Sequence, residues 1–190
     1  MKIYLRDQTK NFPKHLEYLK QRDVIKYDLS KLTGKTTSIA IDTHKNITDL
    51  NLNFFLDYKI FPDNIMTFLT QWDFEKRKMR IGDTIVQQAF IPPVRNFSQK
   101  IIFGVRINKI INETTTIGFS YETIRGHVEM GISTFTIEKT DIGDTIFKIN
   151  TFSKPGNVLM QLVGPFFSVP YQTFCTNQGL KNVKRQLENS

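Results

Sequence analysis

The chain has 190 residues, of which 39% are hydrophobic and 12% aromatic, which excludes an intrinsically disordered protein and predicts one domain covering residues 1–190. The formal net charge is +8, from 26 Lys and Arg against 18 Asp and Glu, which favours anionic ligands or surfaces. The basic residues are scattered rather than gathered in a Lys/Arg-rich arm, so nucleic-acid binding is not expected.

Cysteine use and hydropathy indicate a compartment. Cys175 is the single cysteine, so no disulfide can form within the chain, which fits a reducing environment. The first residues lack the apolar core of a signal peptide, and no apolar run approaches the roughly 18 residues of a membrane span. We therefore expect a soluble, cytoplasmic protein with no membrane-spanning segment.

The first part of the chain predicts one helix and one short strand. Residues 12–22 fit a helix, with Pro13 in the first turn and Leu16 and Leu19 three positions apart. Residues 36–41 are rich in side chains that favour β-structure and are flanked by turn-forming residues, which is typical of a strand.

Two further helices are expected between residues 49 and 72. Residues 49–60 carry apolar side chains three and four positions apart, and Thr48 or Asp49 could cap such a helix. Residues 62–72 would place one apolar stripe on a helical face, formed by Ile65, Phe68, Leu69 and Trp72.

Strands are expected from residue 84 onward, and from Gln99 the apolar residues alternate with polar or small ones. Residues 84–90 follow a turn at 81–83 and predict a strand that ends at Pro92. Four more strands follow, with short polar turns and a loop at residues 122–131 between them. Their alternating positions are Ile101, Phe103, Val105 and Ile107; Ile117, Phe119 and Tyr121; Phe135 and Ile137; and Phe147 and Ile149. Strands in this sequence predict an antiparallel meander.

The last segment loses this alternation and predicts a helix over residues 157–188, with bends at Gly164–Pro165 and at Pro170. An antiparallel sheet that faces the core on one side needs a cover, and this helix is the available one. The fold class is therefore α+β.

The stretch from Ile117 to Phe135 concentrates most of the polar chemistry of the chain. Within nine residues it holds Tyr121, Thr123, Arg125, His127 and Glu129. One hypothesis is that Glu129 orients His127, which acts as a general base or hydrogen-bond donor at the mouth of a cavity. The alternative is that these groups only satisfy one another and the backbone within a polar turn.

An ordered set of short motifs supports a family resemblance. A Trp-x-Phe piece is formed by Trp72 and Phe74, and an Ile-Gly-Asp turn by Ile81, Gly82 and Asp83. The signature Gly-Phe-x-Tyr-x-Thr-x-x-Gly-His-x-Glu-x-Gly is formed by Gly118, Phe119, Tyr121, Thr123, Gly126, His127, Glu129 and Gly131. Phe152, Ser153 and Pro155 end the meander, and Gln172 follows in the terminal helix. With these motifs, residues 72–172 resemble the uncharacterised family DUF1990.

The resemblance implies a fold related to the START and Bet v 1 helix-grip proteins, in which a curved antiparallel sheet wraps a long C-terminal helix around an apolar cavity. It implies no activity. The chain departs from the family pattern at Glu122, where the family usually has Gly, at Ile132, where it tends to have an acidic residue, and at Lys154, where it tends to have Arg.

Several kinds of chemistry are not expected. Three dispersed histidines and one cysteine form no close ligand set, so neither a metal nor another cofactor is predicted. Cys175 lies in a predicted packed helix, where thiols are usually inert, and the chain has no G-x-S-x-G nucleophile elbow and no phosphate-binding loop.

Three functions remain open. The first is a binding module whose cavity holds an unknown apolar or amphipathic small molecule. The second is an enzyme of the same fold that uses His127 and Glu129 as acid and base, and the third is an interaction domain with a filled core and a basic face. The predicted ligand contacts are Phe103, Phe119, Phe135, Phe147, Phe166, Phe167 and Trp72, with Tyr121, Thr123, Arg125, His127 and Glu129 at the polar rim.

Overall fold

The computed structural model describes residues 2–93, 98–155 and 169–189. The strands are β1 (Lys2–Tyr4), β2 (Thr33–Ile41), β3 (Met66–Thr70), β4 (Thr84–Ile91), β5 (Gln99–Asn112), β6 (Thr116–Thr123), β7 (Glu129–Lys139) and β8 (Thr145–Pro155). The helices are α1 (Phe12–Lys20), α2 (Asn53–Leu56), α3 (Gln71–Phe74) and α5 (Val169–Glu188), and single 3-10 turns lie at Thr9–Asn11, Leu29–Lys31 and Ile47–Asp49.

All eight strands belong to one antiparallel sheet with the order β2-β8-β7-β6-β5-β4-β3. The expected meander is confirmed, because β5 to β8 pair consecutively. The short strand β1 pairs with the first residues of β5, beyond the point where β6 ends on that strand.

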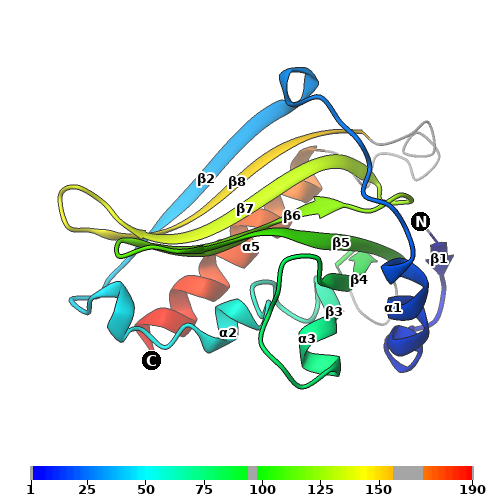
Figure 1. The fold of residues 1–190 in the computed structure, drawn as a ribbon, viewed down its shortest axis with the longest axis horizontal. Coiled ribbons are helices and arrows are strands. Elements are labelled where there is room, and N and C mark those ends of the chain that lie inside the picture. The colour runs from blue at the N-terminus through cyan, green and yellow to red at the C-terminus, as the bar shows by residue number, and fades with distance from the viewer. Residues whose placement is uncertain (1, 94–97, 156–168, 190) are drawn as a thin grey trace.

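The sheet curves around α5, which crosses its inner face (Figure 1). Apolar side chains of α5 pack into the same core as the inward-facing residues of the meander; the α5 members are Leu180, Val183 and Leu187, and the sheet members include Ile85, Val105, Phe119, Phe135 and Phe147. The α+β class and the curved sheet with its covering C-terminal helix are confirmed. The expected bend at Gly164–Pro165 and the expected contacts of Phe166 and Phe167 lie outside the described residues.

The opposite face of the sheet is covered at one end by α1, which confirms the helix predicted over residues 12–22. Its residues Phe12, Leu16 and Leu19 form a second core with Val86 and Ile102. Val86 follows Ile85 of the first core, and Ile102 lies between Ile101 and Phe103 of a third cluster, so β4 and β5 are buried on both faces there. In the described part of the chain, no helix is long and apolar enough to cross a membrane.

The helix predicted over residues 62–72 is wrong. Residues 66–70 form strand β3, which pairs with β4, and only Gln71–Phe74 are helical. Phe68 packs against the first core and Leu69 against the second, so apolar side chains point to both faces of this strand. The helix predicted over residues 49–60 is reduced to a 3-10 turn and the single turn α2. The helix does not continue past Tyr58, because this residue has a left-handed backbone conformation.

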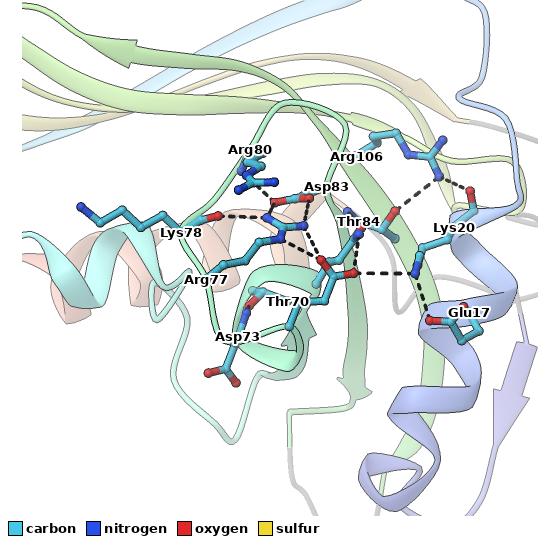
Figure 2. A network of polar contacts seen from close by, with 12 residues as sticks. Glu17, Lys20, Thr70, Asp73, Arg77, Lys78, Arg80, Asp83, Thr84 and Arg106 are labelled. Atoms are coloured by element: carbon cyan, nitrogen blue, oxygen red, sulfur yellow. Dashed lines mark hydrogen bonds and ion pairs between the residues drawn. The ribbon is translucent and has the colours of Figure 1, made fainter.

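A polar network ties the turn at residues 81–83 to α3 (Figure 2). The guanidinium of Arg77 donates two hydrogen bonds to the buried carboxylate of Asp83, at 2.7 and 2.6 Å, and a third to Glu75 at 2.7 Å. The backbone N–H of Arg80 donates to the same Asp83 carboxylate at 2.7 Å. Arg77 is thus committed to an internal ion pair.

Candidate functional site

The site is built on the turn between β6 and β7, which is shorter than the predicted loop. β6 continues to Thr123 and β7 begins at Glu129, so only five residues connect them. The hydroxyl of Thr123 accepts a hydrogen bond from the backbone N–H of Gly131 at 3.1 Å and joins the two strand ends. Gly126, with φ +98°, reverses the chain between them, and the N–H of His127 donates to the carbonyl of Ile124 at 2.9 Å.

This turn holds the ring of His127 in one orientation. The ring lies edge-on to Phe103, with 4.5 Å between centroids, and its Nδ1 accepts a hydrogen bond from the backbone N–H of Glu129 at 3.0 Å. Burial lowers the pKa of His127 to about 4. The imidazole is therefore neutral at physiological pH, with its proton on Nε2 when Nδ1 is the acceptor.

Glu129 contacts this ring through its backbone, and its carboxyl group is the second titratable group of the region. Burial raises the pKa of Glu129, and a hydrogen bond from Ser153 acts in the opposite direction. Both titratable groups of the turn are thereby biased towards their uncharged forms, as expected for side chains that share an enclosed, weakly polar space.

His127 and Glu129 open onto a pocket of about 210 Å³ between the sheet, the segment before β3 and α5. Its apolar lining consists of Phe61, Ile65, Met66, Ala89, Phe103, Val128, Phe135 and Ile149. Its polar lining consists of Lys35, Gln87, Tyr121, His127, Glu129, Ser133, Thr151, Ser153, Cys175 and Thr176. The pocket therefore combines a broad apolar surface with hydrogen-bonding groups, which is typical of small-molecule sites.

Some of the polar groups are already paired with one another. The hydroxyls of Ser133 and Thr151, on neighbouring strands, share a hydrogen bond of 3.0 Å. Gln87 donates from its side-chain amide to the hydroxyl of Tyr58, a fully buried residue behind the pocket. Burial raises the pKa of both Tyr58 and Tyr121, so both phenols stay protonated and can donate.

The residues predicted to contact a ligand are divided by the structure into two groups. Five of them line the pocket together: Phe103, Tyr121, His127, Glu129 and Phe135. The other described ones lie elsewhere: Thr123 is buried in the joint between β6 and β7, Phe119 and Phe147 are in the core, and Trp72 is in the core beside a different pocket. Arg125 points to solvent, 3.9 Å from Asp23.

Sequence reasoning missed several polar residues of the pocket. Ser133 and Thr151 are two positions from Phe135 and Ile149, so extending the alternation by one step would have placed both on the inner face. Ser153 continues the same pattern on β8. Gln87 on β4 had no such signal, since that strand is buried on both faces.

The buried neutral histidine makes stability depend on pH. Because the unfolded chain has a histidine pKa near 6.5 and the folded chain one of about 4, the unfolded state binds more protons between these values. The free energy of unfolding should fall by about 2–3 kcal/mol from pH 6.5 to pH 4 through His127 alone. The raised pKa of Glu129 acts in the opposite direction, and the lowered pKa of His15 acts in the same one.

Urea unfolding across this pH range, in the natural protein and in His127→Asn, measures the contribution of His127 to the pH dependence of stability. Asn keeps an acceptor near the position of Nδ1 but does not titrate, so the variant should lose this part of the pH dependence. His44→Asn, at an exposed position, is the control. Parallel pH curves for the natural protein and His127→Asn would contradict the prediction.

Among the residues whose side chains the structure describes, no group of three His, Cys, Asp or Glu is arranged to hold a metal ion. The family described as Domain of unknown function (DUF1990) matches residues 55–181. A search among curated proteins found no match.

Three solved structures resemble the fold, each with a TM-score of 0.49. A hypothetical protein of Helicobacter pylori is 7% identical over 85% of this chain and 94% of its own. A protein of Chromobacterium violaceum is 15% identical over 82% of this chain and 96% of its own. The ginseng major latex-like protein 151 of Panax ginseng is 9% identical over 82% of this chain and 97% of its own.

Proposed function

This chain belongs to the family described as Domain of unknown function (DUF1990), and because that description specifies no activity, we propose a function from the pocket itself: the binding of an apolar or amphipathic small molecule. The observation that carries the proposal is the two-sided lining of the pocket. Aromatic and aliphatic side chains form one part, and hydroxyl, amide and carboxyl groups from β4, β6, β7 and β8 form the other. An apolar body with one polar end matches this division.

The size of the pocket limits the ligand. Its volume of about 210 Å³ lies below the roughly 300–1,000 Å³ that usual ligand pockets occupy. The proposed ligand is therefore compact. Beside the turn its polar end would carry hydrogen-bonding groups, because His127 is neutral and burial raises the pKa of Glu129.

Native mass spectrometry of the protein as purified from cells tests the proposal, followed by extraction and identification of any bound molecule. We expect a compact amphipathic passenger. In Ser133→Phe, a ring in place of the pocket hydroxyl should displace it, with at least a tenfold loss of affinity if the ring removes about 1.4 kcal/mol of binding free energy.

Ser38→Phe is the matched control, since Ser38 is exposed on β2 and the substitution is the same. Passenger loss in both variants would point to a general effect of the added ring. A natural protein that carries no passenger and binds no compact amphipathic compound added in excess would contradict the proposal and favour a function in protein interactions.

A second function is favoured by one observation: His127 and Glu129, with opposite pKa shifts, line the same pocket. This arrangement would allow acid–base catalysis on a bound ligand. Once a passenger is identified, Glu129→Gln should leave binding intact and abolish its conversion if Glu129 is the proton donor. Equal conversion rates in both proteins would exclude Glu129 as the proton donor, and no conversion by the natural protein would leave binding as the function.

A further inference from the structure

A second, smaller pocket lies on the other side of the turn that carries His127. It has a volume of about 70 Å³ and is bounded by β1, α1 and the turn. Four basic residues line it, Lys2, His15, Arg22 and Arg125, which come from three separate segments of the chain. Phe103 contributes to the walls of both this pocket and the larger one.

Two of the cations are positioned by an aromatic ring. The ammonium of Lys2 lies 4.9 Å and the guanidinium carbon of Arg22 lies 5.5 Å from the ring centroid of Tyr18, which is itself part of the pocket. Like charges that share one ring repel each other, and a bound anion would relieve that repulsion.

A bound anion would also provide a partner for hydrogen-bonding atoms that have none. Among the described side chains, Nε2 of His15 and Nε of Arg22 are buried and have no hydrogen-bond partner. Buried polar nitrogens without partners are uncommon, because each one loses its hydration and gains nothing in return. Burial, together with the charges of Lys2 and Lys14, lowers the pKa of His15.

Negative charge near this pocket is sparse. The carboxylate of Asp23 is 3.9 Å from Nε of Arg125, and both side chains are mostly exposed, so the pair is weak. The last carbonyls of α1, at Leu19 and Lys20, could have repelled an anion. Arg106 already donates to them, at 3.1 and 3.0 Å.

We propose that this pocket binds a phosphate-type oxyanion, with Arg22, Arg125 and Lys2 as cationic donors and His15 as a further donor. Three separate cations suit a doubly charged group better than a carboxylate, and the volume suits an oxyanion with few waters, since a water takes about 30 Å³. The phosphate could belong to a soluble phosphomonoester or to a lipid headgroup. The proposal does not depend on the ligand of the larger pocket.

The test uses the full chain and inorganic phosphate as the probe, with the imidazole resonances of His15 followed by NMR. Phosphate should shift these resonances saturably and raise the pKa of His15. Arg22→Gln combined with Arg125→Gln should weaken binding by about tenfold for each lost charge-assisted contact. Lys109→Gln combined with Lys181→Gln removes the same two charges from exposed positions and should change affinity less than about threefold.

Vesicles distinguish the source of the phosphate. Recruitment to phosphatidylcholine vesicles that contain phosphatidic acid, lost in the Arg22/Arg125 variant only, would identify a lipid headgroup. Saturation by inorganic phosphate without vesicle recruitment would identify a soluble phosphomonoester. Lys2→Gln, at an exposed position, provides a second variant if the arginine changes impair folding. The proposal is overturned if neither probe binds, or if the site variants and the lysine control lose affinity equally.

Discussion

Asp83→Asn should lower the free energy of unfolding by about 3 kcal/mol, which corresponds to a fall in melting temperature of about 6–12 °C. The carboxylate of Asp83 is almost completely buried and accepts two hydrogen bonds from Arg77 and one from the backbone of Arg80. Without this negative charge, the largely enclosed guanidinium of Arg77 keeps only the more exposed carboxylate of Glu75 as an ionic partner. Urea denaturation of both proteins measures the difference directly.

Asp57→Asn provides the control for the loss of one carboxylate. Asp57 pairs with Lys59 at 3.4 Å, but both side chains are about half exposed, so the expected cost is below about 0.5 kcal/mol. A double variant, Arg77→Met with Asp83→Asn, should recover part of the lost stability because it also removes the cation that has lost its buried partner. A cost below about 1 kcal/mol for Asp83→Asn would mean that water screens the pair as it does at the surface.

Gly131→Ala should lower the free energy of unfolding at least as much as Asp83→Asn, by about 3 kcal/mol or more. A Cβ atom at this position would lie 2.0 Å from the carbonyl oxygen of Phe152 and 2.8 Å from Cα of Ser153. Both obstacles are backbone atoms of β8, the strand paired with β7, so relief would require β7 and β8 to separate. The same movement would displace Thr123, which accepts a hydrogen bond from Gly131.

Gly143→Ala is the matched control. Gly143 has φ +90° in the turn between β7 and β8, and no atom lies within 4 Å of an added Cβ. Only the conformational cost of about 1 kcal/mol remains, and thermal unfolding should separate the two variants clearly. Equal losses would mean that the positive φ, and not the close approach of β8, governs the cost at Gly131.

The signature from Gly118 to Gly131 is explained largely by the close packing of β6, β7 and β8 and by the turn between β6 and β7. Gly118 allows β7 to approach, because a Cβ there would lie 2.2 Å from the carbonyl oxygen of Phe135. Thr123, Gly126 and Gly131 shape the turn, as described above. Within the signature, Tyr121, His127 and Glu129 are the residues that line the pocket. The sequence therefore pointed to this stretch of the chain but could not separate the residues that build the turn from those that face the pocket.

The strands were predictable where one face is buried and the other half-exposed. On β8, Phe147 and Ile149 are buried and alternate with half-exposed neighbours. β3 has no such contrast, since Phe68 and Leu69 each meet a different core. A strand covered on both faces shows no period of two, and chance spacing then suggested a helix.

Arg125 was predicted at the rim of the cavity as part of a loop over residues 122–131. In the structure β6 continues to Thr123 and the chain then turns, so Arg125 lies 64% exposed and outside the larger pocket. The turn is held by contacts between the two strand ends, such as that between Thr123 and Gly131, which the pattern of residue types does not specify.

The order of the strands also determines how long β2 must wait for its pairing partner while the chain is being synthesised. β2 pairs with β8, whose residues are translated more than about a hundred positions later; Thr33, for example, pairs with Ser153. At roughly 5–20 residues per second, β2 leaves the ribosome on the order of 5–20 s before its neighbour exists. During that interval the segment Thr36–Ile41 is unpaired, and its side chains favour strands. Chaperones would have to keep it from pairing with other chains until β8 has been synthesised.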